Sequence, residues 1–213
     1  MLTDAHRPAA FFIADHVALD FLNSVGAPWG EEIEWLETPE DLLAWMVEAA
    51  LLSKEKAAHY EKTIEDAHLK SVVKDVRDLR EWFRGFVTKH FGPLTEPLTE
   101  NDIAPLNQIL SKGRYRREIC LGADKEGDDA LLHWRWLETS QNGAEDLLLL
   151  LAEAMGDLIC EADLKLVKNC EGPTCTMWFL DISKNHSRRW CTMSVCGNRA
   201  KAAAFRARKA GKD

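Results

Sequence analysis

A helical spacing of apolar residues is clearest between residues 71 and 91. Apolar side chains recur there every three or four positions, and charged residues occupy most of the positions between them. The members of this apolar stripe are Val72, Val73, Val76, Leu79, Trp82, Phe83, Phe86 and Val87. A period of about 3.6 residues places them on one face of a helix, so we predict a helix that forms the core of a helical domain.

Helix start signals precede the other helices that the sequence predicts. Thr38-Pro39-Glu40-Asp41 combines a capping threonine, a proline in the first turn and an acid that can close a capping box. Ser53 and Thr99 are expected to begin two more helices, the second over residues 100 to 112. Asn142-Gly143-Ala144-Glu145 is expected to cap an apolar helix that continues to Cys160 and lies deep in the core.

A different pattern separates the last two of these helices. Residues 116–121 and 130–138 flank the turn-forming stretch GADKEGDD, and apolar and polar side chains alternate in the second segment. Alternation with a period of two is typical of strands, so we predict an antiparallel β-hairpin near 116–138. The fold class is therefore mainly α with a small antiparallel β element, and a composition change near residues 163–167 divides residues 1–165 from residues 166–213.

Charge distinguishes the two parts of the chain. The whole protein carries a net charge of −8, but residues 168–213 contain ten Lys and Arg against three Asp and Glu. A basic segment on an acidic body can bind phosphate groups locally although the whole protein is acidic. The longest apolar run, Leu147 to Ala152, is far too short for a membrane span. With no export signal at the N-terminus, we expect a cytoplasmic protein whose cysteines stay reduced.

Four of the six cysteines lie in the basic segment and form two pairs with equal spacing. Cys170 and Cys175, and then Cys191 and Cys196, each read C-x4-C. Two such pairs can offer four thiolates to one ion, and a closed Cys₄ tetrahedron is typical of structural Zn²⁺. We therefore predict one structural zinc ion per chain, with four unrelated buried thiols as the alternative. Cys120 and Cys160 stand alone in apolar segments and are expected to pack in the core.

The residues around these pairs predict the shape of the module. Trp178 to Leu180 and Arg188 to Cys191 are expected to form the two strands of a hairpin between the pairs. His186, in the polar loop between them, is expected to face solvent or phosphate, with replacement of a thiolate at the metal as the alternative. Alanines and basic residues then predict a helix over residues 198–209. Gly197 is expected to permit the turn into this helix and Asn198 to cap it.

The run WCTMSVCGNRAK, together with the preceding C-x4-C pair and WFLDISKNHSRRW, resembles the CGNR zinc-finger proteins of bacteria. In that family the finger follows a domain called ABATE, and ALDFLNS at residues 18–24 resembles its opening LDF-x-N motif, with Ser24 where threonine is more usual. The resemblance implies an ABATE-like helical domain over 1–165 and a CGNR finger over 166–213. It also implies a stress-induced transcription regulator that binds double-stranded DNA through the finger.

Candidate DNA contacts follow from the basic side chains of the finger. Phosphate contacts are expected from Arg and Lys, and base contacts from Asn198 and Arg199, because Arg suits guanine and Asn suits adenine. The full candidate set is Arg188, Arg189, Asn198, Arg199, Lys201, Arg206, Arg208 and Lys209. The alternative is that Arg188, Arg189 and Arg199 brace the zinc module, for example by pairing Arg189 or Arg199 with Asp181, and that the terminal cations only aid solubility.

The sequence gives fewer indications of the role of the N-terminal domain. Asp20 and Asn23 would share one helical face and could line a pocket for a small-molecule effector, or instead serve capping and buried hydrogen bonds. One small finger binds DNA weakly, so a homodimer formed through the acidic body is expected. The competing interpretation is a protein-interaction adaptor with a purely structural zinc module. We expect no enzyme, because the sequence contains no phosphate loop, open zinc motif or serine nucleophile motif.

Overall fold

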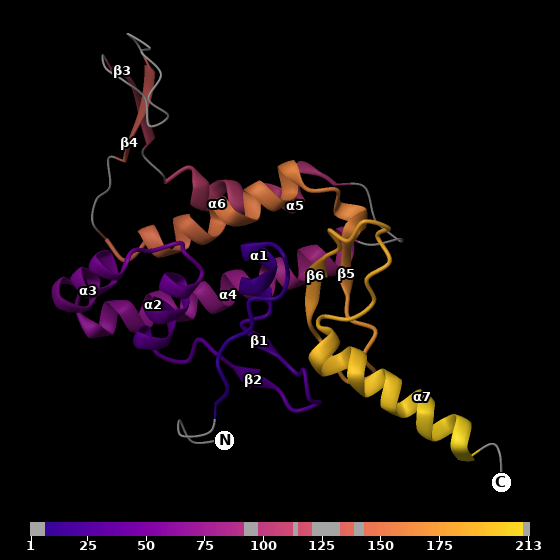
Figure 1. Cartoon of the computed structure of the whole chain (residues 1–213). Helices are drawn as coiled ribbons and strands as arrows, with labels where there is room; N and C mark the ends of the chain where they lie inside the picture. Colours follow the sequence, from indigo (N-terminus) through magenta and orange to yellow (C-terminus); the bar gives the residue numbers. More distant parts are fainter. Residues whose placement is uncertain (1–6, 92–97, 113–114, 121–132, 139–142, 211–213) are drawn as a thin grey trace.

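The computed structural model describes residues 7–91, 98–112, 115–120, 133–138 and 143–210. Side chains of residues 115–120, 133–138 and 210 are not described. Helices α1 to α6 form a body that holds most of the hydrophobic core, and the C-terminal finger, with strands β5 and β6, lies against one end of that body (Figure 1). We call the described residues up to 166 the body and residues 167–210 the finger.

Helix α4 (Asp66–His90) is the central helix of the body. It packs against α1 (Val17–Leu22), α2 (Pro39–Glu48) and α6 (Asp146–Glu161). Most of the predicted apolar stripe is buried, from Val72 to Val87, and only Trp82 is partly exposed. The prediction of a core helix is confirmed, because the helical period places these side chains on one face.

The predicted start signals form N-caps at α2, α3 (Lys54–Thr63) and α5 (Glu100–Leu110). The Thr38 hydroxyl accepts a hydrogen bond from the Asp41 N–H, and the Asp41 carboxylate accepts one from the Thr38 N–H. Ser53 accepts from the Lys56 N–H, and Thr99 forms a second capping box with Asp102. These bonds satisfy backbone donors that lack partners within a helix, which explains where the helices begin.

Helix α6 begins at Asp146 without a side-chain cap, and Asn142 lies outside the described residues. The prediction for Cys160 is wrong, because this residue is exposed near the C-terminal end of α6. The core positions of α6 are Leu147, Leu151, Ala152, Ala154, Met155 and Leu158. Cys160 falls outside this stripe. The prediction was wrong because it relied on the apolar composition around Cys160 and not on its position in the helical period.

Three two-stranded antiparallel sheets complete the described fold. Strand β1 (Val25–Gly26) pairs with β2 (Ile33–Glu34) beside α4. Strand β3 (Tyr115–Cys120) pairs with β4 (His133–Glu138), with Tyr115 opposite Glu138, and this hairpin projects from the body (Figure 1). The predicted strands near 116–138 are thus confirmed, whereas the turn at 121–132 and the side chain of Cys120 lie outside what is described.

Arginine 80 is a buried charge on α4 that joins the helix to the β1–β2 hairpin. Its guanidinium forms two hydrogen bonds to the Glu34 carboxylate, at 2.8 and 2.5 Å, and one to the Ser24 hydroxyl at 2.9 Å. Only 2% of Arg80 is exposed. A buried guanidinium is tolerated because paired, hydrogen-bonded charges recover much of their lost hydration.

The finger continues the core of the body. Strand β5 (Val167–Asn169) pairs with β6 (Trp178–Leu180), and β6 packs on α1. Val167, Met177 and Phe179 are fully buried and join the same apolar cluster as the helices. Within the described part of the chain, every helix is too short or too polar to cross a membrane.

Candidate metal centre and finger surface

The four cysteines of the finger come from three short segments. Cys170 follows β5 and Cys175 precedes β6, so the first pair lies across one hairpin. Cys191 ends the loop after β6, and Cys196 lies in the helical turn η3 (Met193–Gly197) that leads into α7 (Asn198–Ala210). Strand pairing therefore positions one pair of sulfurs and the start of the last helix positions the other.

The four Sγ atoms form a compact, buried cluster. All of them lie within 4.8 Å of one another, and each cysteine is at most 6% exposed. Cys175 and Cys191 are 3.8 Å apart at Sγ, and Cys191 and Cys196 are 3.6 Å apart. A tetrahedron with Zn–S bonds of about 2.3 Å has sulfurs separated by roughly 3.8 Å. The cluster therefore fits a Cys₄ zinc ion, and the separations are far too long for disulfides.

The pKa shifts of the cysteine thiols also favour a bound cation. Hydrogen bonding to the Cys170 sulfur, together with burial, raises the pKa of Cys175 and Cys191, whereas hydrogen bonds from those two groups lower the pKa of Cys170. Crowded sulfurs cannot all ionise unless a positive charge lies among them. One divalent ion removes that restriction, and its binding releases protons.

Glycine 172 leaves room for the sulfurs inside the first knuckle. A Cβ at this position would lie 3.0 Å from Cys175 Cβ and 3.1 Å from Cys196 Sγ. A backbone bond from the Cys175 N–H to the Gly172 carbonyl, at 3.0 Å, closes the same turn. Limited space beside the sulfurs therefore favours glycine at this position.

The second half of the predicted finger hairpin is wrong. Arg188 to Cys191 form no strand, and β6 pairs instead with β5, which precedes the first cysteine. The returning segment meets the first knuckle through one backbone bond, from the Glu171 N–H to the Arg189 carbonyl at 3.0 Å. The loop before Cys191 instead wraps around one buried side chain. Hydrogen bonds from the loop to that side chain, and not strand pairing, determine the path of the loop.

That side chain is Asp181, which is fully buried at the end of β6. Its carboxylate accepts hydrogen bonds from Lys168, from the Ser183 N–H and hydroxyl, and from the Arg188 N–H. Burial alone would raise the pKa of Asp181, but these donors hold it below its usual range. His186 is exposed, its Nδ1 contacts the Asp181 carbonyl, and among the described residues it lies outside the ligand cluster that the four cysteines form.

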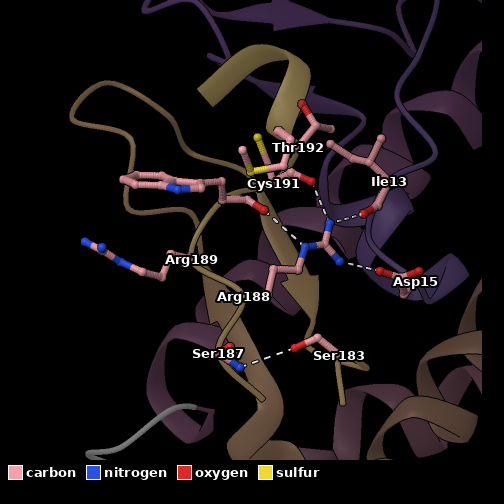
Figure 2. Close-up of a pocket in the computed structure, with 10 residues that line it drawn as sticks. Ile13, Asp15, Ser183, Ser187, Arg188, Arg189, Cys191 and Thr192 are labelled. Atoms are coloured by element: carbon pink, nitrogen blue, oxygen red, sulfur yellow. Dashed lines mark hydrogen bonds and ion pairs between the residues drawn. The ribbon is translucent and has the colours of Figure 1, made fainter. Parts of the chain in front are cut away.

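Arginine 188 connects the metal loop to the body (Figure 2). Its guanidinium donates to the Cys191 and Trp190 carbonyls in the finger, to the Ile13 carbonyl, and to Asp15 in the body. The same group lies 4.1 Å from the centre of the Phe179 ring. With its donors engaged inside the molecule, Arg188 acts as a brace, as the alternative interpretation of this residue expected.

Two further arginines of the finger also make internal contacts. Arg189 pairs with Glu171 at 2.6 Å, and the Arg199 guanidinium donates to the Pro28 carbonyl at 2.6 Å. The expected pairing of either arginine with Asp181 is wrong, because Lys168 and the loop backbone occupy that carboxylate. Arg199 thus joins the start of α7 to the β1–β2 connection, a contact between parts of the chain 171 residues apart.

Asparagine 23 holds β6 of the finger. Its Nδ2 donates to the Trp178 carbonyl and its Oδ1 accepts from the Trp178 N–H, both at 2.8 Å. Asp20, on the same short helix, accepts from the Ile13 and Ala14 N–H groups. Burial raises the pKa of Asp20 to about 6, partly offset by these backbone bonds. Both side chains serve buried hydrogen bonds, the alternative to an effector pocket.

The last helix begins earlier than the sequence suggested. Thr192 is the N-cap of the helical turn η3, its hydroxyl accepts from the Val195 N–H, and Asn198 already has helical backbone angles. The prediction that Asn198 caps the helix is therefore wrong. Gly197 does not adopt a left-handed conformation; a side chain there would collide with Met193. The predicted helix over 198–209 itself is confirmed as α7.

The remaining predicted DNA-contact residues lie on the surface of α7. Asn198 is exposed, as are all residues from Lys201 to Lys209. Among the described residues, Lys201, Arg206, Arg208 and Lys209 have no acidic partner, and Arg189 forms an ion pair with Glu171 at the surface. Arg188 and Arg199 therefore brace the finger, and the other six candidates are exposed. Phe205, 65% exposed on the same helix, was missed by the sequence reasoning, which weighed only charged and amide side chains.

These features define a class of protein: a helical domain that carries a docked four-cysteine zinc finger with a basic terminal helix. Two protein-family profiles match the sequence, the CGNR zinc finger over residues 167–209 and ABATE over residues 15–162. The latter is described as "Putative stress-induced transcription regulator". No curated protein matches the chain. The chain belongs to the ABATE family, with a CGNR finger that binds one structural zinc ion.

Proposed function

We propose that this protein is a zinc-dependent transcription regulator of the bacterial cytoplasm that binds double-stranded DNA through α7. The observation that carries the proposal is the exposed cationic set Lys201, Arg206, Arg208 and Lys209 on a helix without acidic residues. Unpaired exposed cations on a helix that the metal centre positions are suited to phosphates. The family description as a transcription regulator supports the same role.

The proposal assigns the metal a structural role. Four cysteine ligands complete a tetrahedral site and leave no position for a substrate, so we propose no enzymatic activity. A bound ion would stabilise the turn that begins with Thr192 and thereby set the direction of α7. Arg188 and Arg199 then hold the finger in a fixed position relative to the body through their hydrogen bonds to the Ile13 and Pro28 carbonyls.

The body completes the proposal as a dimerisation or effector domain. A single finger offers few DNA contacts, and pairing two copies would double them. An effector would have to bind elsewhere than at Asp20 and Asn23, whose polar atoms are engaged. The competing proposal is an adaptor in which α7 binds an acidic protein; it rests on the same exposed cations.

Salt dependence of binding separates the two candidates. We expect the zinc-loaded full chain to bind duplex DNA at about 50 mM salt, with a log–log salt slope of about −0.9 per phosphate contact. A variant with Lys201→Ala, Arg206→Ala, Arg208→Ala and Lys209→Ala should lose most of that slope. A variant with Lys54→Ala, Lys62→Ala, Lys70→Ala and Lys74→Ala, which removes four exposed lysines of α3 and α4, is the matched control. Absence of duplex binding by the zinc-loaded protein would overturn the regulator and favour the adaptor.

A further inference from the structure

Phenylalanine 205 has no partner in the described structure. Helix α7 continues directly from η3 and then projects away from the finger and the body (Figure 1). Every residue from 201 to 209 is exposed, and Phe205 retains 65% of its accessible surface. A phenylalanine in solvent contributes nothing to the core, and it forms helix less readily than the alanines around it. The ring is therefore available for contact with another molecule.

The two faces of α7 differ in chemistry. At about 100° per residue, the alanines at 200, 203, 204 and 207 fall on one side of the helix. Phe205 falls on the opposite side, among the cations. Lys201 and Arg208 lie on one flank of the phenylalanine, and Arg206 and Lys209 lie on the other. The helix thus presents one aromatic ring between two cationic borders.

This arrangement does not suit a membrane surface. An amphipathic helix that lies in a bilayer carries its large apolar side chains on the face opposite its cations, where they can enter the acyl region. In α7 the large apolar side chain shares the cationic face, and the other face carries only methyl groups. Insertion of Phe205 would draw the flanking cations toward the hydrocarbon.

The same arrangement fits a DNA groove. The major groove is about 12 Å wide and admits one α-helix, with a phosphate backbone on each side and base edges at the bottom. A helix of 13 residues is roughly 20 Å long, so α7 can span several base pairs. Cations on both flanks can then reach both strands, and a central phenylalanine faces the bases. Among base edges, the thymine C5-methyl group is the one that offers an apolar contact.

We propose that α7 lies in the major groove of duplex DNA with Phe205 against thymine methyl groups, while Lys201 and Arg208 contact one phosphate backbone and Arg206 and Lys209 the other. This inference rests on the proposed DNA binding and adds a base-reading residue to it. It adds the exposed middle of α7 to the readout that the sequence predicted at the start of the helix, where Asn198 lies on the same face as Phe205.

The test compares two DNAs and two kinds of variant. The DNAs are an A·T-rich duplex of about 20 base pairs and the same duplex with deoxyuridine in place of thymidine, which removes only the methyl groups. The variants are Phe205→Ala, which forms helix at least as readily as the unmodified chain, and Arg206→Ala as the phosphate-contact control. Binding of the zinc-loaded full chain is measured by fluorescence anisotropy across a salt series, and circular dichroism verifies helix content.

We expect the unmodified chain to prefer thymine DNA over deoxyuridine DNA by about four-fold, because each buried methyl contributes on the order of 0.8 kcal/mol. Phe205→Ala should bind both duplexes equally and keep the salt slope, whereas Arg206→Ala should keep the preference and reduce the slope by about 0.9.

If the unmodified chain binds no duplex, the proposed function fails together with this inference. If it binds with a steep slope but Phe205→Ala leaves the thymine preference unchanged, only the inference is overturned. Phe205-dependent binding that favours single-stranded DNA, or vesicles of phosphatidylglycerol, over duplex would also overturn it, in favour of stacking on unpaired bases or of a membrane contact.

Discussion

Two polar side chains in this protein have structural roles that their residue type alone does not predict. Asp20 is a buried carboxylate that receives two backbone N–H groups, and Asn23, three positions later, binds a strand 155 residues away. Both belong to the segment that resembles the opening motif of the family. These hydrogen bonds explain why a polar residue lies inside the apolar helix α1 and a second one at its C-cap.

Asp20→Asn tests the cost of burying that carboxylate. Because its pKa is about 6 in the folded protein and 3.8 for a solvated aspartate, the unfolded chain loses this proton first as the pH rises. Asp20 therefore lowers stability progressively from pH 4 to pH 6, by about 2 to 3 kcal/mol in total. Asparagine keeps the acceptor without the charge. We expect the variant to gain that amount relative to wild type between pH 4 and pH 7 in urea unfolding.

A constant difference between Asp20→Asn and wild type over this pH range would contradict the raised pKa. The comparison isolates Asp20, because all other titrating groups are the same in both chains.

Gly172→Ala tests whether space limits the metal site. The added Cβ meets Cys175 and Cys196, whose positions the ion holds, so the site must distort. Overpacking typically costs about 1 to 3 kcal/mol, so we expect zinc affinity to fall by a factor of about 5 to 150 in competition with a chromogenic chelator. Gly156→Ala in α6, where a Cβ meets nothing within 4 Å, should leave zinc affinity unchanged. Equal affinity of the two variants would show that the knuckle can relax.

At the scale of elements, the structure is organised by pairings between segments distant in the sequence. Strand β6 packs on α1 and is clamped by Asn23, the Thr176 hydroxyl accepts from the Ala27 N–H at 2.8 Å, and Leu180 donates to the Ala14 carbonyl at 2.8 Å. Gly26 lets β1 approach the finger, since a Cβ there would lie 2.8 Å from Met177 Sδ. The finger is thus docked along one edge rather than tethered by a linker.

Asn23→Ala tests this docking. It leaves the N–H and the carbonyl of Trp178 without their partner, and unmade buried hydrogen bonds of this kind cost about 1 to 3 kcal/mol each. We expect a loss of at least about 2 kcal/mol in urea unfolding, together with faster hydrogen exchange at β6. Ser53→Ala, which removes only the α3 cap, is the comparison: it should lower stability by about 1 kcal/mol without affecting β6. Unchanged exchange at β6 in Asn23→Ala would contradict the clamp.

For the whole molecule, the shared core couples the metal to the stability of the body. Val167, Met177 and Phe179 belong to the same apolar cluster as the helices, and the cysteines lie beside them. Arg188 adds a polar connection between the Cys191 carbonyl and Asp15. Because a structural ion binds only the folded site, its binding free energy contributes to the stability of everything that unfolds with the finger.

Removal of zinc should therefore affect more than the finger. We expect a chelator to lower the Tm of the full chain and to expose the Trp178 and Phe179 segment to proteolysis, and added zinc should restore both. Cys196→Ser should show the lower Tm without any chelator, whereas Ser substitution of the exposed Cys160 should leave the Tm unchanged. A body transition that is insensitive to chelation would mean that the two parts unfold independently.

Local patterns determined a large part of this protein. The stripe from Val72 to Val87, the Thr38 and Ser53 caps, the alternation in β4 and the repeated C-x4-C spacing each act over a few residues, so the sequence predicted α4, α2, α3, the hairpin and the zinc ligands. Motif residues also identified the family before any geometry was known.

Only the tertiary structure decided which side chains face outward and which strands pair. The sequence does not distinguish Arg188, Arg189 and Phe205 in exposure. The Arg188 guanidinium donates to the distant Ile13 carbonyl as well as to two carbonyls nearby, whereas Arg189 forms an exposed ion pair and Phe205 stays exposed. The partner of β6 and the clamp by Asn23 depended on segments about 10 and 155 residues away. Such choices rest on long-range packing and competition for hydrogen-bond partners, which no local pattern of residues encodes.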